Sequence, residues 1–143
     1  MIPKFRGYSQ MVVAELISMG ISYTGEGWVE GYVIQEGNDS YIINGVIEAN
    51  SEYISIGEWI PVFADSVGQA TGLEDAHGNM IYVGDIINVY SRWFSYPKLV
   101  VKFEQGALLV EKDNLFELLS SVSCDSEIIG NIYENPNLLE ENQ

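Results

Sequence analysis

The chain of 143 residues is 47% hydrophobic and 19% charged, a composition typical of a globular protein that is long enough to bury a core. It contains 21 Asp and Glu residues against 6 Lys and Arg residues, which gives a net charge of -15. Nucleic-acid backbones and anionic membrane surfaces attract cationic proteins, so this charge argues against direct binding to either one. We therefore expect no nucleic-acid partner and no membrane partner.

Cysteine usage and the lack of a membrane segment indicate the compartment. The single cysteine, Cys124, excludes an internal disulfide and a cysteine-based zinc site. No apolar run is long enough to cross a bilayer, and residues 1–10 (MIPKFRGYSQ) lack the apolar core of a signal peptide. We expect a cytoplasmic protein.

Residues 11–20 (MVVAELISMG) are the first candidate element, and their pattern is ambiguous. Met11, Leu16 and Met19 form a helical stripe that Gly20 would end. The β-branched VV pair favours a strand instead. Both alternatives stay open at this point.

The next elements are predicted to be strands. Residues 28–35 (WVEGYVIQ) and 40–48 (SYIINGVIE) are rich in Val, Ile and Tyr, with the turn-forming residues GND between them, which predicts a hairpin. Residues 51–63 (SEYISIGEWIPVF) predict further strand, in which Gly57 indicates a bulge and Pro61 a strand end.

The best boundary in the chain lies at residues 64–72 (ADSVGQATG), which are small and turn-forming and have little to bury. We place an N-terminal β-rich lobe at residues 1–67 and a second lobe at residues 68–143.

Residues 71–89 (TGLEDAHGNMIYVGDIINV) hold the densest set of turn signals. Gly78 follows a polar run that suits a type I turn ending in a left-handed residue. Gly84 suits a second sharp turn at positive φ, in which the Asp85 carboxylate accepts from nearby backbone N–H groups. A phosphate-binding loop would need a helix after the glycines and a Lys, Ser or Thr on the phosphate, and neither is present. These glycines are therefore predicted to turn the chain.

The rest of the second lobe is also mainly strand-like. Residues 85–93 (DIINVYSRW), 98–105 (KLVVKFEQ) and 107–112 (ALLVEK) have the spacing expected of a small barrel. Residues 113–122 (DNLFELLSSV) carry apolar side chains on one side of a predicted helix. Residues 126–143 add a strand, a turn and a polar tail.

Three segments of the chain, taken in order, resemble one protein family. They are the opening IPKFR, the segment VGQATGLEDAHGNMIYVGDII and the closing IIGNIYENPNLL. Together they resemble the YopX-like family of phage and prophage proteins of Gram-positive bacteria, in which TGLxDxxGxxIYxGDI is followed much later by IGNIYENPELL. The residues of this structural motif are Gly72, Asp75, Gly78, Gly84, Asp85, Gly130 and Pro136.

The resemblance implies a fold but no activity. It implies a mainly β protein with an SH3-like barrel in its C-terminal part, and the family has no assigned biochemical function. The sequence departs from the family at its start, which usually is FRAWD. Here Phe5 and Arg6 are followed by Gly7, Tyr8 and Ser9, so an aromatic residue is retained but the acidic residue is absent.

Catalytic and metal-binding groups are sparse. His77, the only histidine, lies in a predicted turn and cannot form a triad or a His-rich metal site alone. Cys124 has no basic neighbour in the sequence, and we expect a buried or half-buried side chain. Pairs of acids such as Glu74 and Asp75 arise readily in so acidic a chain, and no EF-hand spacing is present. We predict no catalytic residue, no metal and no cofactor.

The run VYSRWFSYPK, residues 89–98, is the main candidate for binding a partner. It combines large rings with cationic side chains, which are enriched in buried interfaces. Core packing of the rings and stacking of single-stranded bases are the alternatives. The candidate residues are Tyr90, Arg92, Trp93, Phe94 and Tyr96.

The leading functional hypothesis is a non-enzymatic phage or prophage accessory protein, active in the cytoplasm of the bacterial host. It would act by contact with a host or phage protein or by assembling into a homo-oligomer. The alternative is an acidic decoy that imitates DNA towards a host nuclease or DNA-binding protein, which the charge of -15 suggests. A hydrolase is the third possibility, for which no residue constellation is present.

Overall fold

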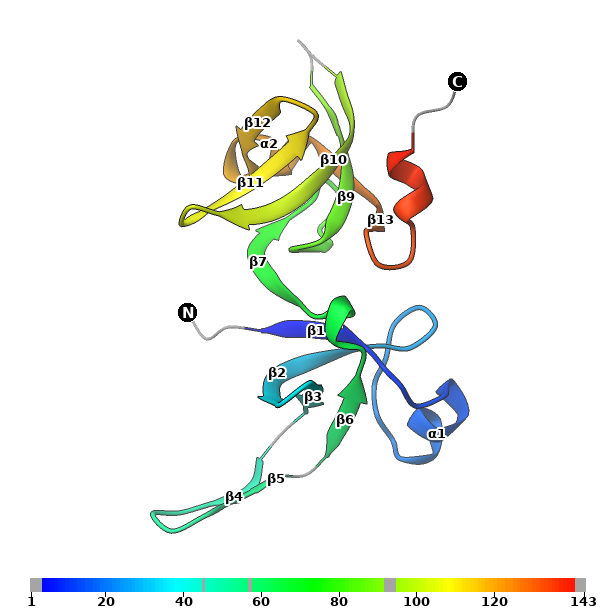
Figure 1. Ribbon diagram of the computed structural model, residues 1–143, viewed down its shortest axis with the longest axis vertical. Helices are drawn as coiled ribbons and strands as arrows, with labels where there is room; N and C mark the ends of the chain where they lie inside the picture. Colours follow the sequence, from blue (N-terminus) through cyan, green and yellow to red (C-terminus); the bar gives the residue numbers. More distant parts are fainter. Residues whose placement is uncertain (1–3, 45, 57, 92–94, 141–143) are drawn as a thin grey trace. The chain divides into compact units, whose positions relative to one another are not determined.

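The computed structural model describes residues 4–44, 46–56, 58–91 and 95–140 of a mainly β chain (Figure 1). It divides into two compact units, Met1–Gln69 and Ala70–Gln143, which we call the N-terminal unit and the C-terminal unit. The strand β7 (Gly68–Glu74) begins in the first unit and ends in the second. None of the helices within the described residues has the length and apolar character needed to span a membrane. The predicted mainly β fold is confirmed.

The N-terminal unit is built on an antiparallel sheet in the order β6-β3-β2-β1. Its strands are β1 (Phe5–Tyr8), β2 (Trp28–Glu36), β3 (Asp39–Ile43) and β6 (Trp59–Val62), and the first residues of β7 pair with β1. The strands β4 (Val46–Ala49) and β5 (Ile54–Ile56) form a separate two-stranded sheet. The helix α1 (Val13–Ser18) and the 3₁₀ turn η1 (Ala64–Ser66) complete the unit.

The predicted hairpin is present as β2 and β3, which pair from Tyr32 opposite Ile43 to Glu36 opposite Asp39. Gly37 takes a φ of +61° in the turn between them. Such a conformation strains residues that carry a Cβ, so the glycine suits this turn.

The ambiguous segment 11–20 forms the helix α1, so the helical alternative is correct. Leu16 is fully buried and joins the core of the unit, whereas Met19 is 44% exposed. Gly20 follows the helix with a φ of +72°, the left-handed conformation that commonly ends a helix. Burial of one leucine outweighs the weak strand preference of the β-branched pair.

Pro61 does not end a strand as predicted. It lies inside β6, opposite Tyr41 of β3. Its carbonyl accepts a hydrogen bond of 2.8 Å from the Gln10 backbone N–H, on the side away from β3. The nitrogen of a residue in an antiparallel strand faces the same side as its carbonyl, so the missing N–H of Pro61 removes no bond to β3.

The core of the N-terminal unit comes from alternate residues of the sheet strands, covered by α1 and the segment after it. Its buried residues are Leu16, Ile21, Val29, Ile42, Ile60 and Val62. Gly7 lies against this core, and a Cβ there would meet the Val62 side chain at 2.9 Å. The close approach of β1 to Val62 therefore requires a residue without a side chain.

The C-terminal unit holds a five-stranded antiparallel sheet in the order β12-β11-β10-β9-β13. The strands are β9 (Asp85–Tyr90), β10 (Ser95–Glu104), β11 (Ala107–Lys112), β12 (Leu115–Leu118) and β13 (Ser126–Asn131). The strand β8 (Met80–Tyr82) pairs with β7. Among the described pairings none joins β12 to β13, so the sheet is not closed on itself.

Short helical segments follow the sheet strands of this unit. They are α2 (Leu119–Val122), η2 (Ser123–Asp125) and η3 (Pro136–Leu139). The core cluster consists of Ile81, Ile87, Val89, Leu99, Val101, Val110, Leu119 and Val122.

The predicted helix over residues 113–122 is mostly wrong. Leu115–Leu118 form the strand β12, paired with β11 through a turn in which Asp113 takes a φ of +54°, and only Leu119–Val122 are helical. Leu118 is 51% exposed, whereas the helical stripe would have placed it in the core. Pairing with the edge of β11 satisfies the backbone of this segment, and tertiary context of this kind overrides helix propensity.

Candidate functional site

The motif residue Asp75 organises the turn between β7 and β8. Its carboxylate is buried, and one oxygen accepts hydrogen bonds of 2.9 Å from the backbone N–H groups of His77 and Asn79. The other oxygen accepts from the N–H of Ile128 in β13 at 3.2 Å. Burial alone would raise the pKa of Asp75, but the backbone donors Asn79, Ile128 and His77 lower it below its ordinary value. Asp75 therefore joins the turn to the last strand as a charged acceptor.

Gly78 and Gly84 both have positive φ, as the sequence predicts. Gly78 has a φ of +82° and donates its N–H to the Asp75 carbonyl at 3.1 Å. Gly84 has a φ of +98°, and the Asp85 carboxylate accepts from the Tyr82 N–H at 2.7 Å across this second turn. Gly72, within β7, also lies in the left-handed region with a φ of +80°.

The closing motif folds onto the same turns. The Ile132 N–H donates to the Gly84 carbonyl at 2.9 Å. A Cβ at Gly130 would lie 2.6 Å from the Asn135 amide oxygen, so the chain approaches itself closely there. Pro136 is the first residue of η3. The two halves of the motif, far apart in the sequence, thus meet in the C-terminal unit and hold its turns together.

The residues considered for catalysis are dispersed. His77 is exposed in its turn, and Cys124 is exposed in η2, so the predicted burial of this cysteine is wrong. Within the described ranges, no group of three or more His, Cys, Asp and Glu side chains is placed to hold a metal ion.

The aromatic run of residues 89–98 is described only in part. Arg92, Trp93 and Phe94 lie outside the described residues. Tyr90, at the end of β9, is 53% exposed, and its hydroxyl accepts from the Asn88 amide at 2.9 Å. Tyr96 is half-buried and packs against the core of the C-terminal unit. The described part of the run therefore divides between the surface and the core.

A larger group of exposed apolar side chains lies on the N-terminal sheet. Residues directly opposite each other in paired strands share a face, and so do residues two apart along a strand. The register places Tyr32 beside Ile43 and Trp59, and Ile34 beside Tyr41 and Pro61. All of them lie on the face opposite the core. We call this the aromatic face: Tyr32, Ile34, Tyr41, Ile43, Trp59 and Pro61.

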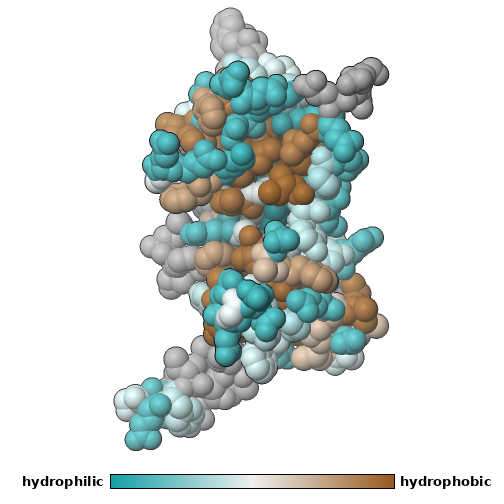
Figure 2. Space-filling view, viewed as in Figure 1, coloured by the Kyte–Doolittle hydropathy of each residue, from teal (hydrophilic) through white to brown (hydrophobic). Residues whose placement is uncertain are grey.

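The aromatic face is accessible at several of its members. Trp59 is 64% exposed, Tyr32 50% and Ile34 44%. The rings of Tyr41 and Trp59 lie 5.2 Å apart between centroids, and Ile43 is buried. Figure 2 shows apolar residues at the surface of both units, interrupted by hydrophilic ones.

Acidic side chains border the aromatic face. Glu36 and Asp39 stand opposite each other at the hairpin end, and both are exposed. Glu58 precedes Trp59, and Glu30 forms an ion pair with Lys4. Like charges placed opposite each other in a sheet are destabilising, so the pairing of Glu36 with Asp39 does not itself stabilise the hairpin.

Sequence reasoning missed the aromatic face although a signal was present. The strands β2, β3 and β6 carry apolar residues at consecutive positions rather than at alternate ones. Such runs are typical of strands that are covered on both faces. In this sheet one of the two faces is accessible.

Arg6, in the opening segment FRGYS (residues 5–9), contacts an aromatic ring. The Arg6 guanidinium lies 4.7 Å from the centre of the Trp28 ring, and Tyr8 meets the same ring edge-on at 5.3 Å between centroids. A cation over an indole face is a favourable contact. Trp28 thus provides a contact for Arg6 in a sequence that lacks the usual acidic residue.

Comparison with known proteins identifies the family. The family model described as YopX protein matches residues 5–140 of the chain. The chain belongs to the YopX family. The resemblance inferred from the motif segments is therefore confirmed, and the matched range of this YopX protein includes both units.

A solved structure with a similar fold is among those that match this chain. It is the crystal structure of protein EF1440 from Enterococcus faecalis, with 23% sequence identity and a TM-score of 0.57. The alignment covers 98% of this chain and 99% of that chain. Among proteins with curated descriptions, none matches.

Proposed function

We propose that this member of the YopX family is an accessory protein of phage or prophage type that acts without catalysis in the cytoplasm of a bacterial host. It works by protein–protein contact, foremost with copies of itself. Membership of the YopX family supports the phage-type assignment. The observation that carries the mode of action is the exposed aromatic face of the N-terminal sheet.

An exposed patch of this kind favours association. Soluble monomers rarely expose contiguous apolar side chains without a use for them, and aromatic residues are enriched where interfaces are buried. Tyr32, Ile34 and Trp59 are each close to half exposed or more. Burying the part of each side chain that is still exposed contributes about 1 kcal/mol to the free energy of association.

These magnitudes predict a weak assembly. Two copies that cover each other's aromatic faces gain roughly 6 kcal/mol in total. Lost translational and rotational freedom opposes association by about 4 kcal/mol or more. At most about 2 kcal/mol remains, which corresponds to a dissociation constant of about 30 mM, so a dimer at accessible concentrations requires contacts beyond these three side chains.

Charge modulates this balance. The rims of both copies are acidic and each chain carries a net charge of -15, so like charges repel in a face-to-face pair. Salt screens this repulsion, whereas the apolar contact does not depend on it. Raised salt should therefore strengthen the association.

Light scattering at two salt concentrations tests the proposal. We expect the molar mass to rise with protein concentration and with salt, and the double variant Tyr32→Thr/Trp59→Thr to remain monomeric. The matched control is Phe103→Thr/Phe116→Thr, which removes two rings that are 62% and 51% exposed from the C-terminal unit. A monomer at every concentration and salt overturns self-association. If only the control variant loses self-association, the interface lies on the C-terminal unit. If both variants still associate, the interface lies on another surface, such as the aromatic run.

We also propose that the C-terminal unit is an SH3-like barrel. Its five-stranded antiparallel sheet and the 3₁₀ turn η2 directly before the last strand support this assignment. Nuclear Overhauser effects between residues of β12 and β13 test it, because a barrel-like sheet bends until its two end strands approach each other even where no hydrogen-bonded pairing joins them. A sheet whose end strands show no such contacts in solution would overturn the assignment.

The second candidate function is the acidic decoy that imitates DNA. The charge of -15 supports it, as does the acidic rim at Glu36 and Asp39. Contacts of a decoy with a cationic partner weaken steeply as salt rises. Rising salt therefore weakens the binding of a decoy to its partner but strengthens self-association. One series of salt concentrations distinguishes the two functions.

A further inference from the structure

A groove in the C-terminal unit concentrates the chain's few cationic residues. It has a volume of about 520 Å³, and its lining holds three lysines, three acids and two apolar residues: Lys98, Lys102, Lys112, Glu111, Asp113, Glu140, Val100 and Leu139. Those lysines are three of only 6 Lys and Arg residues in the whole chain.

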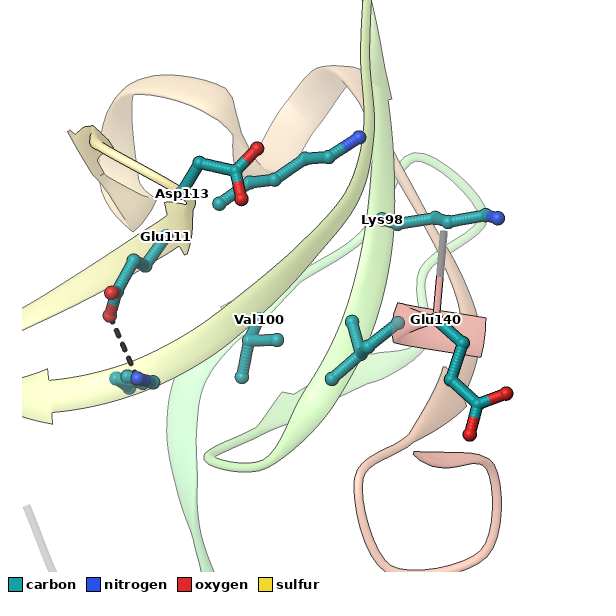
Figure 3. A pocket seen from close by; sticks show the side chains of 8 residues that line it. Lys98, Val100, Glu111, Asp113 and Glu140 are labelled. Atoms are coloured by element: carbon teal, nitrogen blue, oxygen red, sulfur yellow. Dashed lines mark ion pairs between the residues drawn. The ribbon is translucent and has the colours of Figure 1, made fainter. Parts of the chain in front are cut away.

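One lysine of the groove is already paired. The Lys102 ammonium lies 2.8 Å from the Glu111 carboxylate and 3.9 Å from that of Glu104. The hydrogen bond that the Lys102 ammonium donates to Glu111 raises the pKa of Lys102 above its ordinary value. Figure 3 shows the contact with Glu111 at one end of the groove.

The other two lysines have no such partner. Within the described part of the chain, neither Lys98 nor Lys112 forms an ion pair. Asp113 and Glu140 also line the groove but do not pair with either lysine. Figure 3 shows Lys98 and Glu140 on one side of Val100, with Glu111 and Asp113 on the other. Two ammonium groups therefore remain available beside an apolar floor.

The backbone holds Lys98 in an unusual conformation. Its φ is +59°, and the pairing of β9 with β10 shifts register between Tyr96 and Leu99. The Asn88 side chain fixes this bulge by accepting the Lys98 N–H at 2.8 Å. Bulges re-aim side chains and are common beside binding sites, and left-handed residues with a Cβ persist only where the surroundings hold them. This bulge places Lys98 on the groove.

We propose that this groove binds a phosphate monoester, with Lys98 and Lys112 on the phosphate and Val100 and Leu139 against an apolar part of the ligand. A phosphate monoester carries about -1.5 to -2 at neutral pH, and Lys98 and Lys112 are the two cations of the groove that are left to meet it. The carboxylates of Asp113 and Glu140 oppose an anion, so the apolar part of the ligand has to contribute to binding. Lysine ammonium groups bind phosphate as point charges. This site is independent of the aromatic face and of the proposed self-association.

A titration followed by two-dimensional amide NMR, at protein concentrations where the chain is monomeric, tests the site. The probes are phenyl phosphate, inorganic phosphate and phenyl sulfate, a monoanion of the same shape as phenyl phosphate. We expect saturable shifts around Lys98 and Lys112 with phenyl phosphate. Inorganic phosphate should bind more weakly because it lacks the apolar part, and phenyl sulfate because it carries less charge.

Substitutions locate the binding. Lys98→Met and Lys112→Met should each lower the affinity for phenyl phosphate about tenfold. That is the usual effect of losing a hydrogen bond to a charged group. The matched control is Lys4→Met, which removes a lysine of the N-terminal unit that pairs with Glu30. The amide spectra of the variants without ligand show that they are folded. Equal affinity in all three variants, or no saturable shift with any phosphate, overturns the proposal.

The pH dependence and a peptide probe sharpen the assignment. The second pKa of a phosphate monoester is about 6, so affinity should fall several-fold from pH 7 to pH 5 while the lysines stay protonated. A phosphoserine peptide distinguishes the source of the phosphate. Binding of the peptide but not of phenyl phosphate assigns the groove to a phosphorylated protein, and the reverse assigns it to a small molecule. Affinity that is unchanged between pH 7 and pH 5 contradicts recognition of a dianion.

Discussion

The sheets of the two units have similar core faces but different outward faces. Both cores are built from aliphatic residues of alternate strand positions. Outward, the N-terminal sheet presents the rings of Tyr32 and Trp59, whereas the C-terminal sheet presents the ion pair of Lys102 and Glu111. One architecture thus offers an apolar surface in the first unit and a charged groove in the second. This difference is the reason that we assign the aromatic face to a protein contact and the lysine groove to binding of an anion.

The largest effect that tests this comparison comes from the core side of β6. Ile60 is fully buried, next to the exposed Trp59 in the same strand. Ile60→Ala should destabilise the N-terminal unit by about 2–5 kcal/mol, because it removes apolar contacts and leaves a cavity. Urea unfolding followed by the amide NMR signals of the N-terminal unit measures the change. A cost below about 1 kcal/mol would mean that the two faces of the sheet are assigned the wrong way round.

The next effect concerns the turns of the C-terminal unit. Asp75→Ala leaves the backbone N–H groups of His77, Asn79 and Ile128 without their carboxylate acceptor. Leaving a buried donor unsatisfied costs about 1–3 kcal/mol, so we expect a loss in that range or above it. Amide hydrogen exchange should rise in β13 and leave the N-terminal sheet unchanged. Asp65→Ala, at an exposed acid in η1, is the control. Equal protection of β13 in both variants would contradict the role of Asp75.

The same carboxylate predicts a pH dependence. The pKa of Asp75 in the folded protein lies below its ordinary value of 3.8. The charged form therefore stabilises the fold above that ordinary value, and the stabilisation is lost as the pH falls through the lower pKa of the folded state. Wild-type stability should fall more steeply than that of Asp75→Asn below pH 3.8. Parallel curves for the two proteins would show that other acids dominate the acid response.

The features that could be predicted from the sequence are local ones. The hairpin of β2 and β3 and the positive φ of Gly78 and Gly84 depend on residues a few positions apart. The bond from Ile128 to Asp75 joins residues 53 positions apart, so no local pattern reveals it.

The features that were missed depend on pairing between strands. The aromatic face appears only when the register of β2, β3 and β6 is known, because each strand alone shows apolar residues on both faces. The sequence predicts a helix at β12 because the spacing of its leucines fits the period of a helix as well as that of a strand. Pairing with β11 makes this segment a strand. The lysine groove likewise brings together residues of β10, β11 and the region of η3.

The smallest effect on stability should come from the outward face of the N-terminal sheet. Trp59→Thr removes a ring that is 64% exposed and keeps a residue that favours strands. The folded state loses mainly the contact with the Tyr41 ring, and such a contact contributes about 0.5–1.5 kcal/mol. We therefore expect a stability change of at most about 1.5 kcal/mol, in contrast to that of the adjacent Ile60→Ala. The measurement is urea unfolding of the monomer followed by circular dichroism. A loss as large as that of Ile60→Ala would show that Trp59 is part of the fold rather than of a contact surface, and the assignment of the aromatic face to protein contact would then fall.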